Sequence, residues 1–171
     1  GDIRQVTSGT EVKAHPVWMA PANRIAFMQS RLTFTWPRTY AINVARPGTP
    51  VAIATLNGIH RRIAEMLWSR AAQAFLVVYW NGLARSLARV PLQLPKVMLS
   101  PTAFPATVED VTTLDRGATA WIQSDPRGLR TLRYLARGAR EPITLLHITS
   151  PAKSAELCRA EVITWHNGSG V

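Results

Sequence analysis

Cysteine is almost absent from this 171-residue sequence, and its scarcity excludes two ways of holding a small protein together. Cys158 is the only cysteine, so the chain has neither an internal disulfide framework nor a cysteine-based metal site. Long apolar runs are missing as well. The longest, from Ala71 to Trp80, is half of the roughly 20 residues that a membrane-spanning helix needs, and it contains Gln73. The sequence therefore predicts no membrane span and a fold held by an ordinary apolar core.

Residue groups that carry out chemistry are also missing. The histidines are scattered, with no pair at metal-ligand spacing: His15, His60, His147 and His166. Cys158 has no elbow glycines beside it, and no glycine-rich phosphate loop is present. Glu109 and Asp110 are the only adjacent acidic pair, and they follow a proline-rich segment where solvated carboxylates are common. We therefore expect no catalytic residue, no cofactor and no metal, which indicates a protein that is not an enzyme. A small enzyme or a conjugation-machinery component is the weakest alternative.

Acidic residues are few in relation to basic ones. Ten Asp and Glu stand against 20 Lys and Arg, and the formal net charge of +10 calls for an anionic partner. Only Lys13, Lys96 and Lys153 are lysines, and the remaining basic residues are arginines. The planar guanidinium group favours bidentate contacts with phosphate or carboxylate. A GC-rich genome would enrich arginine too, and both explanations stay open.

One segment gathers five arginines within fourteen residues, interleaved with leucines: Arg127, Arg130, Arg133, Arg137 and Arg140. As a helix, three of them would line one face and could follow a phosphate backbone. As a loop, they would form a flexible basic patch, and they could instead pair with acids of a neighbouring subunit. We therefore expect this segment to contact RNA or another subunit.

Short β-prone runs bounded by turn residues occur along most of the chain. Phe75–Trp80 is an unbroken apolar block closed by Asn81 and Gly82, which predicts a buried strand and a tight turn. Further runs lie at 32–36, 42–44, 51–53, 118–123, 143–149 and 161–165. Four prolines between 91 and 105 predict a loop-rich crossing there. Between 59 and 68, apolar residues at i, i+4, i+7 and i+8 predict one short amphipathic helix.

The sequence thus predicts a mainly β, single-domain sandwich or jelly roll of about seven or eight short strands with one short helix. Residues 1–21 lack a sustained apolar period, so we expect an extended N-terminal arm that becomes ordered only against a neighbour. Residues 22–171 would form the single β-sandwich domain. No internal repeat or second composition regime divides the chain.

Two stretches carry a resemblance to a known family. Ile63-Ala64-Glu65-Met66-Leu67-Trp68-Ser69-Arg70 followed by Phe75-Leu76-Val77-Val78 resembles the helix-then-strand segment of picornavirus-like capsid jelly rolls. The runs around Ala120-Trp121-Ile122, Pro142 to Ile148 and Glu161 to Trp165 are similar to the last three strands of such a roll. The resemblance covers roughly residue 30 to the end.

The resemblance implies a structural subunit of an icosahedral RNA virus capsid. Such a subunit assembles with copies of itself or related capsid subunits, encloses RNA, and is found in the virion and in the host cytoplasm during assembly. The alternative, from the same charge and arm, is an RNA-binding structural protein of a ribonucleoprotein particle such as a ribosome, in the cytoplasm or an organelle. Neither reading implies a cofactor or an active site.

Overall fold

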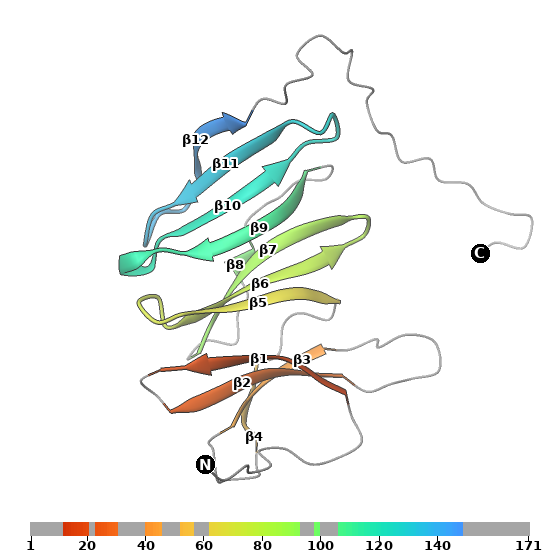
Figure 1. The fold of residues 1–171 in the computed structure, drawn as a ribbon. Helices are drawn as coiled ribbons and strands as arrows, with labels where there is room; N and C mark the ends of the chain where they lie inside the picture. Colours follow the sequence, from red (N-terminus) through yellow and green to blue (C-terminus); the bar gives the residue numbers. More distant parts are fainter. Residues whose placement is uncertain are drawn as a thin grey trace, which may run out of the picture.

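The computed structural model describes residues 12–20, 23–30, 40–45, 52–56, 62–92, 98–99 and 106–148. Within these ranges, twelve strands form three antiparallel sheets of four strands each, taken in order along the chain (Figure 1). Every hydrogen-bonded neighbour in a sheet is also the neighbour in sequence. Each sheet is therefore a meander.

The strands of the first sheet are β1 (Val12–Met19), β2 (Arg24–Ser30), β3 (Tyr40–Ala45) and β4 (Ala52–Leu56). Those of the second are β5 (Ile63–Ser69), β6 (Ala74–Asn81), β7 (Ala84–Pro91) and β8 (Met98–Leu99). Those of the third are β9 (Thr107–Thr113), β10 (Thr119–Ser124), β11 (Arg130–Leu135) and β12 (Ile143–Ile148). A short 3-10 turn, η1 (Asp115–Gly117), joins β9 to β10.

The middle sheet has both faces buried, and β6 shows this most directly. Phe75, Val77 and Tyr79 pack into an apolar cluster shared with the first sheet. Leu76 and Val78 point the other way, into a second cluster with Trp121 and other residues of the third sheet. Successive side chains of a strand alternate between its faces, so a strand covered on both sides needs apolar residues at every position. The unbroken block of β6 is the result.

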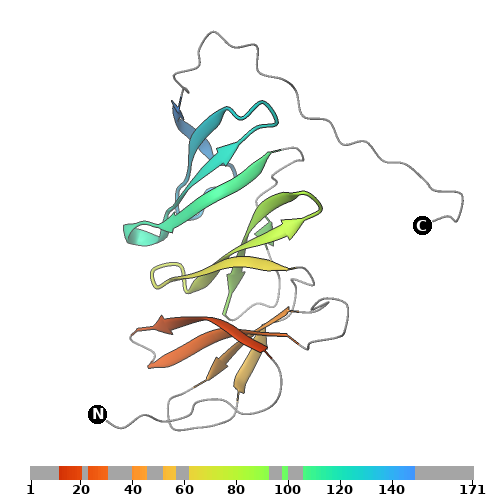
Figure 2. The same cartoon turned by 45° about the vertical axis from the view of Figure 1, so that its right-hand side comes forward.

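The three sheets follow one another face to face (Figures 1 and 2). β1, the first strand of the first sheet, contacts β5, and β9, the first strand of the third sheet, contacts β7 most extensively and also β5 and β6. The first strand of each sheet also carries an irregularity of register, at 14–17 in β1, 63–65 in β5 and opposite Ile122–Gln123 in β9. Radial repetition of four-stranded sheets is the construction of β-propeller blades.

The prediction of a mainly β chain is confirmed, although the described residues hold twelve strands rather than seven or eight. The arrangement also differs in detail from a jelly roll, which distributes eight strands over two sheets with Greek-key connections. Three consecutive meanders take the place of that arrangement.

The predicted helix between 59 and 68 is wrong, because Ile63–Ser69 is strand β5. The register shift between Ile63 and Glu65 is a β-bulge that adds one residue to this strand. Ile63 and Met66, three residues apart, therefore both face the cluster shared with the first sheet. A bulged strand thus reproduced the apolar spacing of a helix.

The predicted N-terminal arm contains a strand of the first sheet. β1 pairs with β2 from Val12 to Met19, so this part of residues 1–21 belongs to the sheet and not to an arm ordered only by a neighbour. The expected strands at 32–36 and 161–165 lie outside the described residues, as does most of the proline-rich segment. The expected strands at 118–123 and 143–149 correspond to β10 and β12.

Candidate binding site at the arginine end of the sheets

The five arginines predicted as one basic segment are divided between the two ends of the third sheet. Arg127 lies in the turn between β10 and β11, while Arg137 and Arg140 lie in the turn between β11 and β12, at the opposite end. Arg130 and Arg133 lie within β11. The helical alternative is wrong because β11 pairs with β10 and β12 along its length.

Two of these arginines have partners inside the sheet. The Arg130 guanidinium forms an ion pair with the Glu109 carboxylate of β9. Arg133 donates from Nη1 to Thr144 Oγ1 (2.6 Å) and from Nη2 to the Pro142 carbonyl (3.2 Å). Both side chains stabilise contacts within the third sheet, which leaves less of their hydrogen-bonding capacity for RNA or another subunit.

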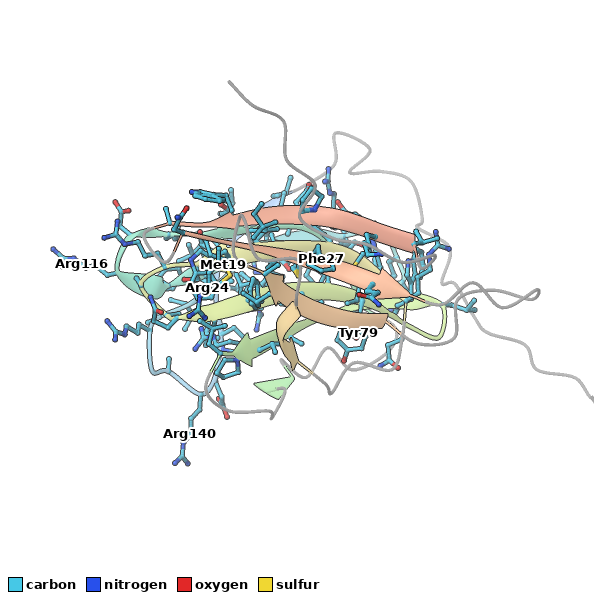
Figure 3. The ribbon with its side chains drawn as sticks, turned by 90° about the horizontal axis from the view of Figure 1, so that it is seen from below. Met19, Arg24, Phe27, Tyr79, Arg116 and Arg140 are labelled. Carbon is cyan, nitrogen blue, oxygen red and sulfur yellow. The ribbon has the colours of Figure 1, made fainter. Side chains whose placement is uncertain are left out.

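A different group of arginines gathers at one end of the molecule, which we call the arginine end. The first turns of all three sheets and the last turn of the third lie there (Figures 1 and 2). Figure 3 shows Arg24, Arg116 and Arg140 toward this end, with Tyr79 toward the other. Its described charged residues are five arginines and two acids: Arg24, Arg70, Arg116, Arg137, Arg140, Asp115 and Glu141.

A pocket of about 680 Å³ opens at the arginine end between the second and third sheets. One wall is the end of β5 and its turn, namely Trp68 to Ala71 and Gln73, and the other is Thr113 to Arg116. The volume lies within the range of about 300–1,000 Å³ that small-ligand sites occupy. We call it the turn pocket.

The two walls approach each other closely at Gly117. Its φ of +84° is in the left-handed region that favours glycine, and a Cβ built there would lie 3.2 Å from the Ala72 nitrogen and 3.3 Å from the Ala71 carbonyl carbon. Each wall also carries a non-glycine residue in this region, Gln73 (φ 47°) and Arg116 (φ 63°). Such conformations cost about 1–3 kcal/mol and persist only where the surroundings impose them. The shape of the pocket is therefore built into both turns.

Hydrogen bonds hold the first wall in shape. The Gln73 backbone N–H donates to the Arg70 carbonyl (3.3 Å), and Gln73 Nε2 donates to the same oxygen (2.7 Å). In the second wall, the Leu114 N–H donates to the Ala118 carbonyl (2.9 Å). Backbone hydrogen bonds thus close both turns, and the Gln73 side chain adds a second bond to the first of them.

The pocket combines free positive charge with an apolar wall. Within the described part of the chain, neither Arg70 nor Arg116 forms an ion pair, and both side chains are exposed. Trp68 is half-buried against Phe75 (ring centroids 4.9 Å apart), and its indole Nε1 is buried with no hydrogen-bond partner among the described residues. Buried donors without partners are rare in folded proteins. The pocket thus offers two exposed guanidinium groups and some apolar surface to a ligand.

Charged side chains of the adjoining first strands form a second group. Burial raises the pKa of the Glu65 carboxyl above the value of 4.5 of a free glutamate, and the negative charge of Asp110 on β9 raises it further. Arg85 and His15 oppose this increase. Among the residues that the structure describes, no three side chains of metal-ligating type come together. This group therefore provides electrostatic contact between sheets and no metal site that we can identify there.

Sequence reasoning missed Arg24, Arg70 and Arg116 as a group because they come from three different turns. Each of the three turns contains a non-glycine residue with positive φ, namely Asn23, Gln73 and Arg116. Four residues lie between the paired residues Met19 and Arg24, and four lie between the paired residues Ser69 and Ala74, so the first two sheets have equivalent first turns. This spacing was the available signal, although it indicates turns and not binding.

Comparisons with known proteins identify a fold and no family. No family model and no curated protein matches the sequence. Among solved structures, the chain is similar to a variant of the AtxE2 isopeptidase with Astexin3-dC4 bound, with a TM-score of 0.61 and 15% identity. The match covers 91% of this chain and 24% of that chain, so this chain spans about a quarter of the isopeptidase's length. In the described residues no helix has the length and apolar character that crossing a membrane requires.

Proposed function

We propose that the chain is a non-catalytic structural module: three consecutive sectors of a ring of four-stranded sheets, of the β-propeller type. The observation that carries this proposal is the sequence of three four-stranded meanders in which each sheet covers a face of the next. Its role is to pack against further sheets of the same construction and to present its turns to a ligand.

The free face of the third sheet supports this role. Trp121 points into the cluster shared with the second sheet, so its neighbour Ile122 points to the opposite face. Leu132 pairs with Ile122 on β10 and with Leu146 on β12, and directly opposed residues share a face. Leu146 is 56% exposed, and Ile143 on the same strand is 57% exposed. This face of the third sheet is therefore apolar like a buried face, yet no sheet among the described residues covers it.

The first sheet ends in a similar way. Met19 points into the cluster shared with the second sheet, and the adjacent Trp18 is 53% exposed. A repeat that buries apolar residues on both faces in its middle sheet needs partners at both of its ends. The whole chain of the isopeptidase whose fold this chain resembles is about four times as long as its matched part.

This role keeps the expectation of a non-catalytic building block and proposes further four-stranded sheets as its neighbours. The capsid and ribonucleoprotein assignments stay predictions, since the comparisons bear on neither.

Self-association of the purified chain tests the proposal. Without further sheets, the free face of one copy should pack on the first sheet of another in a head-to-tail manner. Size-exclusion chromatography with light scattering should therefore find species larger than a monomer at micromolar concentration. The double substitution Ile143→Lys/Leu146→Lys should return the chain to a monomer, because it places two charges in the apolar contact.

The matched control is Leu83→Lys/Leu129→Lys, which adds the same charge at two exposed leucines in turns. It should leave the distribution of species unchanged. A wild-type chain that stays monomeric across the concentration range would overturn the proposal, and so would equal dissociation by both double variants.

A further inference from the structure

The charge balance of the turn pocket indicates the kind of ligand. Arg70 and Arg116 contribute two cations to its lining, and Asp115 contributes one anion. Guanidinium groups bind carboxylates and phosphates through paired hydrogen bonds. A ligand with only negative groups would be repelled by Asp115, whereas a ligand that also donates hydrogen bonds could use it.

The apolar wall adds a second requirement. Trp68, Ala71 and Leu114 line the pocket, and Leu114 is 42% exposed. Covering them removes apolar surface from water, which favours a ligand with an aliphatic or aromatic side chain near its charge.

We propose that the turn pocket binds a short acidic peptide segment. Arg70 and Arg116 pair with carboxylates of the peptide, Asp115 accepts a hydrogen bond from a peptide backbone N–H, and the apolar wall at Ala71 and Leu114 receives an adjacent apolar side chain. The inference does not depend on the ring proposed above, since both pocket walls lie within the described sheets.

RNA fits the same residues less well. Single-stranded nucleic acids bind proteins largely by stacking bases on exposed aromatic faces. The Trp68 ring already packs on Phe75 at an interplanar angle of 51° and is only half-exposed. The pocket therefore lacks a free aromatic platform, and the peptide explains more of its lining.

Fluorescence anisotropy with labelled probes and the full chain tests the inference. The probes are an octapeptide alternating Glu and Leu, the same peptide with Gln in place of Glu, and a mixed-sequence RNA octamer. The acidic peptide should bind more tightly than the other two. The double substitution Arg70→Gln/Arg116→Gln should weaken its binding at least about 10-fold, since paired charge-assisted hydrogen bonds are lost.

The matched control removes two exposed arginines away from the arginine end, Arg62→Gln/Arg127→Gln, with the same change in net charge. Its affinity for the acidic peptide should stay within about 2-fold of wild type, because distant exposed charges are screened. Leu114→Asn tests the apolar wall at an exposed position and should weaken the acidic peptide about 3-fold or more without lowering the unfolding temperature.

Several outcomes overturn the inference. Equal losses in the pocket and control variants would mean that only the overall charge attracts the peptide. Equal binding of the Gln peptide would mean that carboxylates are not recognised. Tighter binding of RNA than of the acidic peptide, with the same dependence on Arg70 and Arg116, would assign the pocket to nucleic acid. An absence of measurable binding to any probe also overturns it.

Discussion

Replacing Gly117 by alanine should destabilise the protein through two separable effects. The first is conformational: at a φ of +84° an L-residue costs about 1–2 kcal/mol, offset by roughly 0.4–1 kcal/mol because alanine restricts the unfolded chain. The second is steric, since the new Cβ would lie 3.2–3.3 Å from backbone atoms of Ala71 and Ala72. Backbone atoms cannot rotate away as a flexible side chain can. Overpacking of this kind costs about 1–3 kcal/mol. We expect a total loss of about 2–4 kcal/mol.

Gly128→Ala separates the two effects. Gly128 has a φ of +78°, but a Cβ added there would meet nothing within 4 Å. This variant should therefore lose about 1 kcal/mol or less, from the conformational effect alone. Urea unfolding followed by circular dichroism, with equal m-values for the three proteins, gives both free energies. Equal losses for the two variants would refute the close approach of the two pocket walls.

Two further predictions concern charged residues. The raised pKa of Glu65 means that the folded state favours the protonated carboxyl, so its contribution to stability is present at low pH and is lost as pH rises through that pKa. Glu65→Gln should therefore unfold at a higher temperature than wild type near pH 7 and at a similar temperature near pH 4. Calorimetry that finds a constant difference in unfolding temperature across this range would contradict the reasoning. Arg133→Gln removes hydrogen bonds to Thr144 and Pro142 and should lower the free energy of unfolding by about 1–3 kcal/mol. The control Arg137→Gln, in an exposed turn, should change this free energy by less than about 0.5 kcal/mol. Urea unfolding that finds equal losses for the two variants would show that the Arg133 hydrogen bonds do not stabilise the fold specifically.

The strands that sequence reasoning found are those with the simplest burial. Phe75–Trp80 is apolar throughout because both faces of β6 are covered, and the turn at Gly82 has a φ of +66° that suits glycine. β10 and β12 were recognisable for a related reason, since β-branched and aromatic residues are concentrated there. A continuous apolar run is informative without knowledge of its partners.

Other strands were missed because their signal depends on partners distant in sequence. β7 buries small residues, Ala84, Ser86 and Ala88, that are interspersed with partly buried arginines, so its sequence has the composition of a polar segment. β11 has leucines and arginines three residues apart, a spacing typical of a helix, yet pairing with β10 and β12 makes it a strand. Tertiary pairing overrides local periodicity in such segments.

The sequence predicted the negative charge of the ligand proposed for the candidate site but not the residues that form the site. The excess of arginine indicated an anionic partner, but which arginines act together depends on the meander, which brings the turns of three sheets to one end. Arg137 and Arg140 belong to that end, whereas Arg127 lies at the other. Sequence proximity grouped residues that the topology separates.

The restriction of every strand pair to sequence neighbours has a consequence for how the chain acquires its structure. A meander closes only short loops, so each sheet can form without waiting for remote segments, and folding is faster than in β proteins that depend on remote pairings. The second sheet, with apolar residues on both faces, then offers a template on either side. Since the first sheet is complete before the third leaves the ribosome, assembly can proceed during synthesis, one sheet at a time.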